Sequence, residues 1–331
     1  MNNVLNNSTN GNLVLKNTST KCVNIAYFIM VHRLPNQFKR LFKAIYDPEN
    51  YYLIHIDNKS TDIIKNDINN FLKHFPNVFI MKSKNVIWGG YSMVQAELDG
   101  MKYLLELNIK WDYFINLSGQ DYPLKSQNII RQFLTENKGK NYLKFSIQNI
   151  YRPETMNRIE NHFKEMDDNI SPLTYKRDYM RNTVPYIGGQ WMILTRDCCR
   201  FICNNKEVKK FEDYYLNTLI PDESFFQTVL MNTSFEGVLI NDDKRAIIWI
   251  PDGDIKLRPK TFTESDFDFL QLGNNLFARK FNDNVDDKII NIIESFLNYP
   301  LSSKTIKINY SIIDLLLNKV RNIKHNLKFS F

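Results

Sequence analysis

Residues 23–32 read VNIAYFIMVH, a near-continuous apolar run that ends in a polar residue. A run without alternation of apolar and polar positions is typical of a strand buried on both faces of a parallel sheet. Residues 34–46 then place apolar side chains at helical spacing, and residues 51–57 (YYLIHID) repeat the apolar run with a polar end. This stretch therefore predicts a strand, a helix and a second strand.

Strand and helix patterns continue to alternate up to about residue 145. Such alternation predicts an α/β fold, with a mostly parallel sheet flanked by helices. The expected helices are 63–75, 93–107 and one that begins at residue 127, and the expected strands are 78–81 and 112–117, with a turn at 88–90. Later in the chain, a polar and irregular stretch is expected at 150–185, strands at 190–195 and 276–281, and helices at 222–231, 285–297 and 312–327.

Length and composition suit one continuous domain over residues 21–300. The chain has 331 residues, of which 43% are hydrophobic, enough for a large core. Residues 1–20 are rich in Asn, Ser and Thr and lack a signal-peptide pattern, so a disordered leader is expected there. No apolar run is long enough to cross a bilayer.

The net charge of +7 favours an anionic partner, but the excess is concentrated in residues 301–331. A nucleic-acid platform, with cations interleaved among aromatic residues, is not indicated. The tail instead predicts a basic amphipathic helix. It can lie on the anionic face of a membrane as a peripheral contact, or it can pack on the domain.

Four cysteines are too few for a disulfide framework in a chain of this length. Cys198, Cys199 and Cys203 lie close together, but no histidine stands at metal-ligand spacing. Reduced, partly buried thiols and a cytoplasmic location are expected.

Three polar residues follow the predicted strands: His32, Asp57 and Asp121. In open parallel sheets, ligands bind beyond the carboxyl ends of the strands. Asp121 stands where many nucleotide-sugar enzymes carry Asp-x-Asp for a divalent cation, but Gly119 occupies the other acidic position. One carboxylate plus phosphates can hold Mg²⁺. A structural aspartate in the turn before Pro123 is the other reading.

Pro221-Asp222-Glu223 introduces a predicted helix, and Glu223 in its first turn could take a proton from a hydroxyl. Acids are also common there because they oppose the helix dipole. Arg258, Arg279 and Lys280 could neutralise a leaving pyrophosphate without a metal, or could be solvated surface charges. The chain contains no glycine-rich dinucleotide or P-loop motif and no nucleophile elbow.

Seven segments, in order, resemble the core-2/I-branching and peptide O-xylosyltransferase family, glycosyltransferase family 14. Their sequences are more similar to the xylosyltransferase branch. They are AYFIMVHR (26–33), AIYDPENYYLIHIDNKS (44–60), IWGGYS (87–92), WDYFINLSGQDYPL (111–124), GGQWMILTR (188–196), PDESFFQTVL (221–230) and LFARKFN (276–282). The resemblance implies a GT-A-type, Rossmann-like fold with C-terminal helices. It also implies an inverting transfer of xylose or N-acetylglucosamine from a UDP-sugar to a hydroxyl of a glycan or peptide.

By this resemblance, Glu223 is the base, and no metal or other cofactor is required. The residues expected at the nucleotide and its diphosphate are His32, Asp57, Arg258 (allowing a one-residue gap), Arg279 and Lys280. Those expected at the donor or acceptor sugar are Trp88, Asp121, Gln190, Trp191, Asp222 and Trp249. The chain departs from the family in its few cysteines, in Ile248 where xylosyltransferases carry Asp, and in 151–185, which has no match. The alternative is a nucleotide-sugar- or glycan-binding protein of the same fold without catalysis.

Overall fold

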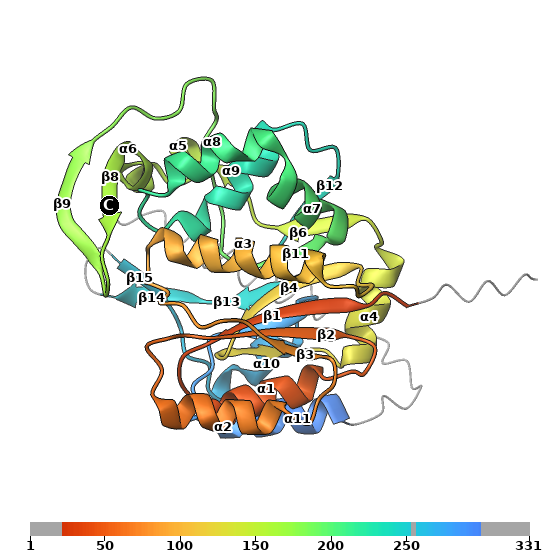
Figure 1. Ribbon diagram of the computed structural model, residues 1–331. Coiled ribbons are helices and arrows are strands. Elements are labelled where there is room, and N and C mark those ends of the chain that lie inside the picture. Colours follow the sequence, from red (N-terminus) through yellow and green to blue (C-terminus); the bar gives the residue numbers. More distant parts are fainter. Residues whose placement is uncertain (1–21, 253–255, 299–331) are drawn as a thin grey trace, which may run out of the picture. The chain divides into compact units, whose positions relative to one another are not determined.

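A computed structural model of the chain describes residues 22–252 and 256–298. Within these residues the largest sheet has seven strands in the order β12-β6-β11-β4-β1-β2-β3 (Figure 1). Its strands are β1 (Ile25–Val31), β2 (Tyr51–Ile56), β3 (Val78–Ile80), β4 (Tyr113–Ser118), β6 (Lys140–Leu143), β11 (Met192–Thr195) and β12 (Val238–Asn241). The strands pair in parallel except that β11 runs against both β4 and β6. The predicted α/β class with a mostly parallel sheet is confirmed.

Helices cover both faces of this sheet (Figure 1). One face carries α3 (Tyr91–Glu106), α7 (Arg196–Asn204), α8 (Lys206–Tyr215) and α9 (Phe225–Asn232), and the other carries α1 (Pro35–Ile45), α2 (Asp62–Leu72) and α11 (Lys288–Asn298). The shorter or peripheral helices are α4 (Gln127–Glu136), α5 (Gln148–Tyr151), α6 (Asn157–Glu160) and α10 (Phe267–Gln271), with 3₁₀ segments η1 (Pro153–Thr155), η2 (Pro221–Glu223) and η3 (Glu264–Asp266).

The central strand β1 shows why its sequence has no polar positions. Ile25, Tyr27 and Ile29 pack into the cluster that contains α1, α2 and α11, whereas Ala26 and Phe28 pack into the cluster that contains α3 and α9. Every residue of β1 is therefore buried, as expected for a strand covered on both faces.

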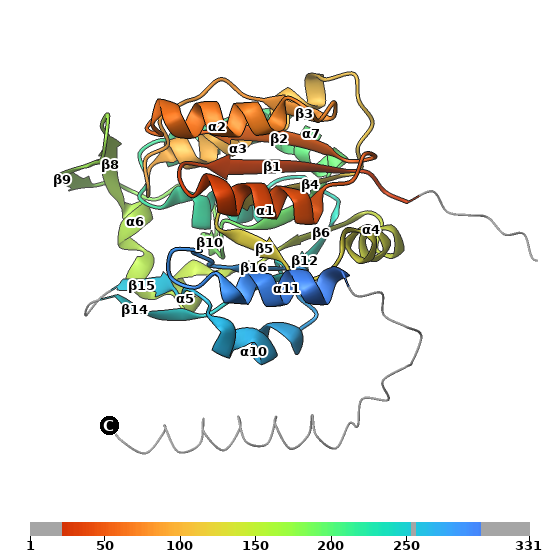
Figure 2. The ribbon, with the colours of Figure 1, turned by 90° about the horizontal axis from the view of Figure 1, so that it is seen from below.

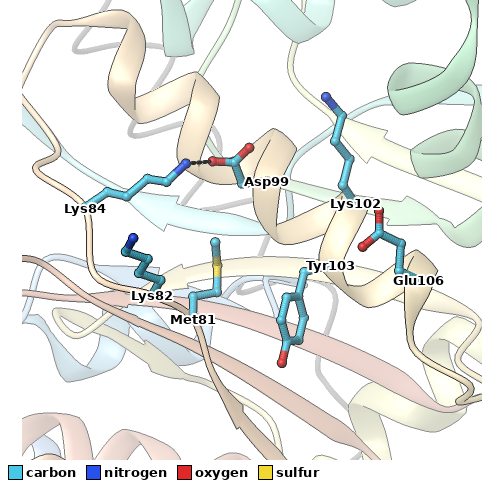
Figure 3. Close-up of a pocket in the computed structure, with 7 residues that line it drawn as sticks. All are labelled: Met81, Lys82, Lys84, Asp99, Lys102, Tyr103 and Glu106. Carbon is cyan, nitrogen blue, oxygen red and sulfur yellow. Dashed lines mark hydrogen bonds and ion pairs between the residues drawn. The ribbon is translucent and has the colours of Figure 1, made fainter.

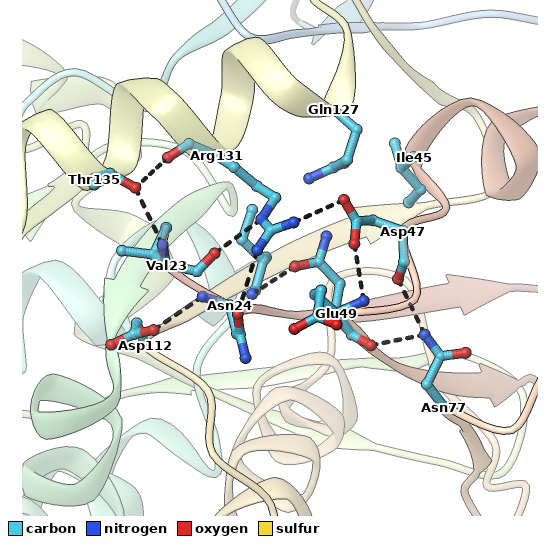
Figure 4. Close-up of polar contacts among 12 residues, drawn as sticks. Val23, Asn24, Ile45, Asp47, Glu49, Asn77, Asp112, Gln127, Arg131 and Thr135 are labelled. Atoms are coloured by element: carbon cyan, nitrogen blue, oxygen red, sulfur yellow. Dashed lines mark hydrogen bonds and ion pairs between the residues drawn. The ribbon is translucent and has the colours of Figure 1, made fainter. Parts of the chain in front are cut away.

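The beginning of β1 is fixed by a polar network at the edge opposite the carboxyl ends of the parallel strands (Figure 4). The Arg131 side chain of α4 donates from Nε to the Val23 carbonyl at 3.0 Å and from Nη1 to Asp47 Oδ2 at 2.8 Å. The Asn24 amide donates to Asp112 Oδ2 at 2.9 Å. One arginine thus connects the first strand to α4 and to the loop after α1.

Four small two- and three-stranded sheets complete the fold. They are formed by β13 (Arg245–Ile247), β16 (Phe277–Arg279) and β5 (Asp121–Pro123); by β14 (Trp249–Asp252) and β15 (Lys256–Pro259); by β8 (Asn161–Glu165) and β9 (Ile170–Lys176); and by β10 (Tyr186–Ile187) and β7 (Ser146–Ile147). Both views place β14–β15 and β8–β9 at the end of the molecule toward which β1 points (Figure 1 and Figure 2).

Two local expectations were wrong. The 150–185 stretch is not irregular, since it holds two short helices and the β8–β9 hairpin. The helix expected at 222–231 is divided: Pro221–Glu223 form the 3₁₀ turn η2, and α9 begins only at Phe225, because Ser224 has a non-helical backbone (φ −141°, ψ −23°).

Other expectations concern the thiols and the chain ends. Cys198 and Cys199 are buried in α7, Cys203 is partly buried, and none of the three forms a disulfide, as predicted. No helix among the described residues has the length and apolar character that a membrane crossing demands. The leader at 1–20 and the basic tail at 301–331 lie outside the described residues, so both stay predictions, as does the domain at 21–300.

We expect Arg131→Ala to lower the free energy of unfolding by about 2–4 kcal/mol, because it leaves the largely buried Asp47 carboxylate without its partner. Urea unfolding measures this loss. The control is Lys138→Ala, which removes a 3.6 Å pair with Asp112 from an exposed side chain and should cost at most about 0.5 kcal/mol. Equal losses in the two variants would contradict the prediction.

Candidate active site

The candidate site lies at the carboxyl ends of the parallel strands, where a distant segment joins the sheet. β16 pairs antiparallel with β5, and their register sets Arg279 opposite Asp121. These residues are 158 positions apart in sequence. The pairing brings Arg279 and Lys280 to the loop that follows β4.

Asp121 is completely buried and both of its oxygens accept hydrogen bonds. Oδ2 accepts from the Ser118 backbone amide at 2.6 Å, and Oδ1 accepts from Arg279 Nη1 at 3.0 Å. Arg279 also donates to the Ser118 hydroxyl. This geometry favours the structural reading of Asp121 over a metal ligand.

Two further observations bear on a metal. The described residues contain no group of three or more His, Cys, Asp or Glu side chains placed to hold one. Asp57, the other acid at the strand ends, uses its carboxylate to accept from the backbone amides of Lys59 (2.8 Å) and Val86 (3.2 Å). It therefore fixes the loops around β2. Whether the protein needs a metal stays a prediction.

Four cations gather near His32, since the charges of Arg33, Arg279 and Lys280 act on it and that of Arg258 acts on Lys280. Burial lowers the pKa of Lys280, and the neighbouring charges of Arg279, Arg33 and Arg258 lower it further. The pKa of His32 is also lowered, first by burial and then by Arg33, while Asp57 opposes the shift. Because like charges gathered at one place repel each other, the group is suited to an anion with several negative charges.

The members of this group differ in their protein contacts. Arg33 Nη2 donates to Gln120 Oε1 at 3.0 Å, and Arg258 lies 3.5 Å from Asp252 at an exposed position. The Lys280 amine forms no hydrogen bond or ion pair with a described residue. The sequence does not single out Arg33, although its place directly after His32 at a strand end was an available signal.

Glu223 lies in η2, which backbone hydrogen bonds attach to two neighbouring segments. The Gly188 amide donates to the Glu223 carbonyl at 2.7 Å, and the Ile220 amide donates to the Gly89 carbonyl at 2.7 Å. Gly89 has a φ of +78°, which glycine adopts without strain. The Glu223 side chain is one-fifth exposed, and its Oε2 accepts from Arg158 Nη1 at 2.8 Å.

Asp222 connects the acidic and the cationic parts of the site. Its pKa is raised to about 7, mainly by burial and then by the Glu223 carboxylate, while Arg158 and Arg279 oppose the rise. The charges of the candidate base Glu223 and of one of the four cations, Arg279, thus both act on the pKa of Asp222. Asp222 is therefore the residue through which the acids of η2 are linked to the cation Arg279.

The indole of Trp191 is buried and lies next to Arg279. The Arg279 guanidinium carbon lies 4.7 Å from the centre of the Trp191 ring, and that of the buried Arg245 lies 5.9 Å away. Gln190 donates from Nε2 to Glu97 Oε1 at 3.1 Å. Glu97 is a second residue that the sequence does not single out.

Trp88 and Trp249 are largely solvent-exposed, at 70% and 48%. Neither forms an aromatic or cation–π contact with a described residue of the site, so the structure does not bring them into the polar network. Exposed aromatic faces of this kind are suited to stacking on a sugar.

An open pocket of about 250 Å³ lies elsewhere, between α3 and the segment after β3 (Figure 3). Lys82, Lys84 and Lys102 line it, and Lys84 pairs with Asp99. None of the residues predicted for the site belongs to it, so it is separate from the candidate active site.

Comparison with known proteins identifies the family to which the chain belongs. The model of the "Core-2/I-Branching enzyme" family matches residues 25–277. The chain belongs to this family. Mouse xylosyltransferase 2 is 32% identical over 305 residues, which cover 86% of this chain and 35% of the mouse protein. Human beta-1,3-galactosyl-O-glycosyl-glycoprotein beta-1,6-N-acetylglucosaminyltransferase 3 is 28% identical over 301 residues, covering 83% and 68%.

The relatives of the chain thus include two kinds of named transferase, and the chain spans about a third of the length of the xylosyltransferases that it matches. Among solved structures, the galactosyltransferase LgtC aligns over 84% of this chain and 98% of its own, with 8% identity and a TM-score of 0.41. At that level of similarity the sheet order and the family, not this alignment, support the fold.

We expect Arg279→Met to lower the free energy of unfolding by about 3 kcal/mol, because the buried Asp121 loses its partner. In the double variant Arg279→Met/Asp121→Asn, the loss of stability should be mostly reversed, because residue 121 no longer carries a charge. The double-mutant cycle should give a coupling of about 1–3 kcal/mol in urea unfolding. Additive losses would mean that the two side chains do not depend on each other.

Proposed function

We propose that this protein is an inverting glycosyltransferase that moves xylose or N-acetylglucosamine from a UDP-sugar to a hydroxyl of a glycan or peptide. Membership of the core-2/I-branching enzyme family supports glycosyl transfer. The observation that carries the proposal is the gathering of four cations at the strand ends, coupled through Asp222 to the acidic turn that holds Glu223.

Glu223 is the base in this proposal. Its Oε2 accepts a hydrogen bond from Arg158, while its Oε1 forms no hydrogen bond with a described residue. That oxygen is free to accept the proton of an attacking hydroxyl. Displacement from the face opposite the leaving diphosphate then inverts the anomeric centre.

The leaving UDP carries negative charge that must be neutralised as the glycosidic bond breaks. The Lys280 amine makes no polar contact with a described residue, and Arg258 and Arg33, whose charges act on it, make one each. Charge-assisted hydrogen bonds contribute about 1.5–3 kcal/mol each, so two or three can replace much of what a divalent ion supplies. We therefore propose that transfer requires no metal or other cofactor.

The remaining roles follow from position. His32 and Asp57 would lie near the nucleoside, Gln190, Trp191 and Asp222 near the donor sugar, and Trp88 and Trp249 on the acceptor side. A cytoplasmic location, with peripheral membrane contact through the tail, belongs to the same proposal.

A protein of this fold that binds a nucleotide-sugar or glycan without catalysis is the second candidate. Glu223 argues against it, because a protein that only binds has no need of a carboxylate oxygen left without a hydrogen-bond partner among the described residues. Turnover of the parent, and its loss in Glu223→Gln, separate the candidates.

We expect Glu223→Gln to lower kcat by about 10²–10⁴-fold, because the amide cannot take the acceptor proton. UDP release in the presence of UDP-sugar and acceptor measures the rate, and calorimetry should show UDP affinity changed by no more than about twofold. Glu154→Gln, at an exposed acid that pairs with Arg152, is the control. Unchanged turnover in Glu223→Gln would exclude this base, whereas no turnover in the parent with any donor and acceptor would favour the second candidate.

We expect Lys280→Met to weaken UDP binding by about 10–100-fold, because the diphosphate loses one charge-assisted hydrogen bond. Calorimetry is done in EDTA, so a metal cannot substitute for the lysine. Lys288→Met, at an exposed lysine of α11, is the control and should bind UDP as the parent does. Strict dependence of binding or transfer on Mn²⁺ would contradict the metal-independent proposal.

A further inference from the structure

Glu97 is a completely buried acid in the middle of α3. Its Oε1 accepts two hydrogen bonds, from Asn116 Nδ2 at 2.7 Å and from Gln190 Nε2 at 3.1 Å. Its Oε2 is equally buried and has no hydrogen-bond partner among the described residues. One oxygen of the carboxyl group is therefore saturated and the other is unsatisfied.

The surroundings of Glu97 contain no compensating positive charge. It forms no ion pair with a described lysine, arginine or histidine, and the charged group that acts on it is another acid, Asp222 of η2. α3 packs against η2, and Asp222 Oδ1 is also buried without a partner. Burial raises the pKa of Glu97 to about 8, Asp222 adds to the rise, and the two amides oppose it.

Several elements pack around α3. β1 and β2 are two of them, and none of their titratable side chains, His55 of β2 included, shifts the pKa of Glu97. β4 contributes the neutral amide of Asn116, the segment before β11 contributes Gln190, and η2 contributes Asp222, on which Glu223, Arg158 and Arg279 act in turn. α7, on another side of α3, contributes the thiols of Cys198, Cys199 and Cys203, and none of its charged side chains shifts the pKa of Glu97.

We propose that Glu97 is a positioning residue that works as a neutral carboxylic acid, holding the Gln190 amide while leaving the negative charge of the buried pair to Asp222. The role in transfer rests on the proposed function. Glu97 Oε1 accepts the hydrogen bond from Gln190 Nε2. This contact fixes the Gln190 side-chain amide, so that its oxygen, Oε1, has one orientation. Because protonated Glu97 is neutral, it adds no second negative charge beside the turn that holds Glu223. Such a charge would repel the diphosphate of the donor.

Glu97→Gln separates this role from that of an ionised glutamate. The amide has the shape of the protonated acid: its oxygen can accept both hydrogen bonds, and its NH₂ group replaces the O–H. Glu97→Leu keeps a similar size and removes all polar contacts. Glu106→Gln, at an exposed glutamate of the same helix, is the matched control.

The first measurement is urea unfolding as a function of pH, which needs no substrate. With a folded-state pKa of about 8 and an ordinary value of 4.5, native Glu97 keeps a proton that the unfolded chain releases. Its contribution therefore makes the parent less stable as pH rises between these two values. Glu97→Gln lacks this loss, so its stability relative to the parent should increase from pH 5 to pH 8, whereas Glu106→Gln should show no such trend.

The second measurement is the pH profile of transfer. Glu97→Gln should keep kcat/KM within about threefold of the parent near neutral pH, and its alkaline decline should move to higher pH. Glu97→Leu should lose about tenfold or more in kcat/KM, since Gln190 and Asn116 lose their acceptor.

The outcomes are distinct. A stability difference between Glu97→Gln and the parent that does not change with pH would overturn the neutral form of Glu97. Equal loss of transfer in Glu97→Gln and Glu97→Leu would overturn the positioning role. If the parent transfers no sugar at all, the proposed function fails, and the unfolding series still decides whether Glu97 carries a proton.

Discussion

The ion pair between Arg279 and Asp121 is the contact on which the arrangement of the site depends. Asp121 is shielded from water at the carboxyl end of the central strands, and Arg279 reaches it only because β16 returns to pair with β5. This pairing places Lys280 beside Arg33 and lays the Arg279 guanidinium on Trp191.

Charge at the site is divided between two sides that meet at Asp222. The cations lie at the strand ends, and the acids Asp222 and Glu223 lie on a 3₁₀ turn packed against α3. A protonated Glu97 would limit the negative charge on the acidic side. The site would then present less negative charge to an anionic donor, a balance that depends on burial as much as on pairing.

The sequence predicts the parts of the fold whose apolar pattern is strong, such as β1, β2 and α1. It does not predict the β8–β9 hairpin, because that segment is mostly exposed and its polar residues give no two-residue period. Asp121 and Arg279 were predicted separately, but their pairing depends on a long-range register that no local pattern encodes. Glu97 had a signal: it shares the buried stripe of α3 with Val94, Leu98 and Met101, where an acid is unusual.

The reversed strand β11 has a consequence for how such a domain can diversify. Leu143 ends β6 and pairs with Met192, which begins β11, so residues 144–191 leave and re-enter the sheet at adjoining points. However long it becomes, this segment is topologically a hairpin loop, and the entropy of loop closure rises only slowly with length. Exchanging it as one unit would leave the seven-stranded sheet in place, and Arg158, Gln190 and Trp191 of the site would change together with it. The four cations lie in three separate stretches of the chain, so no single exchanged segment replaces them all.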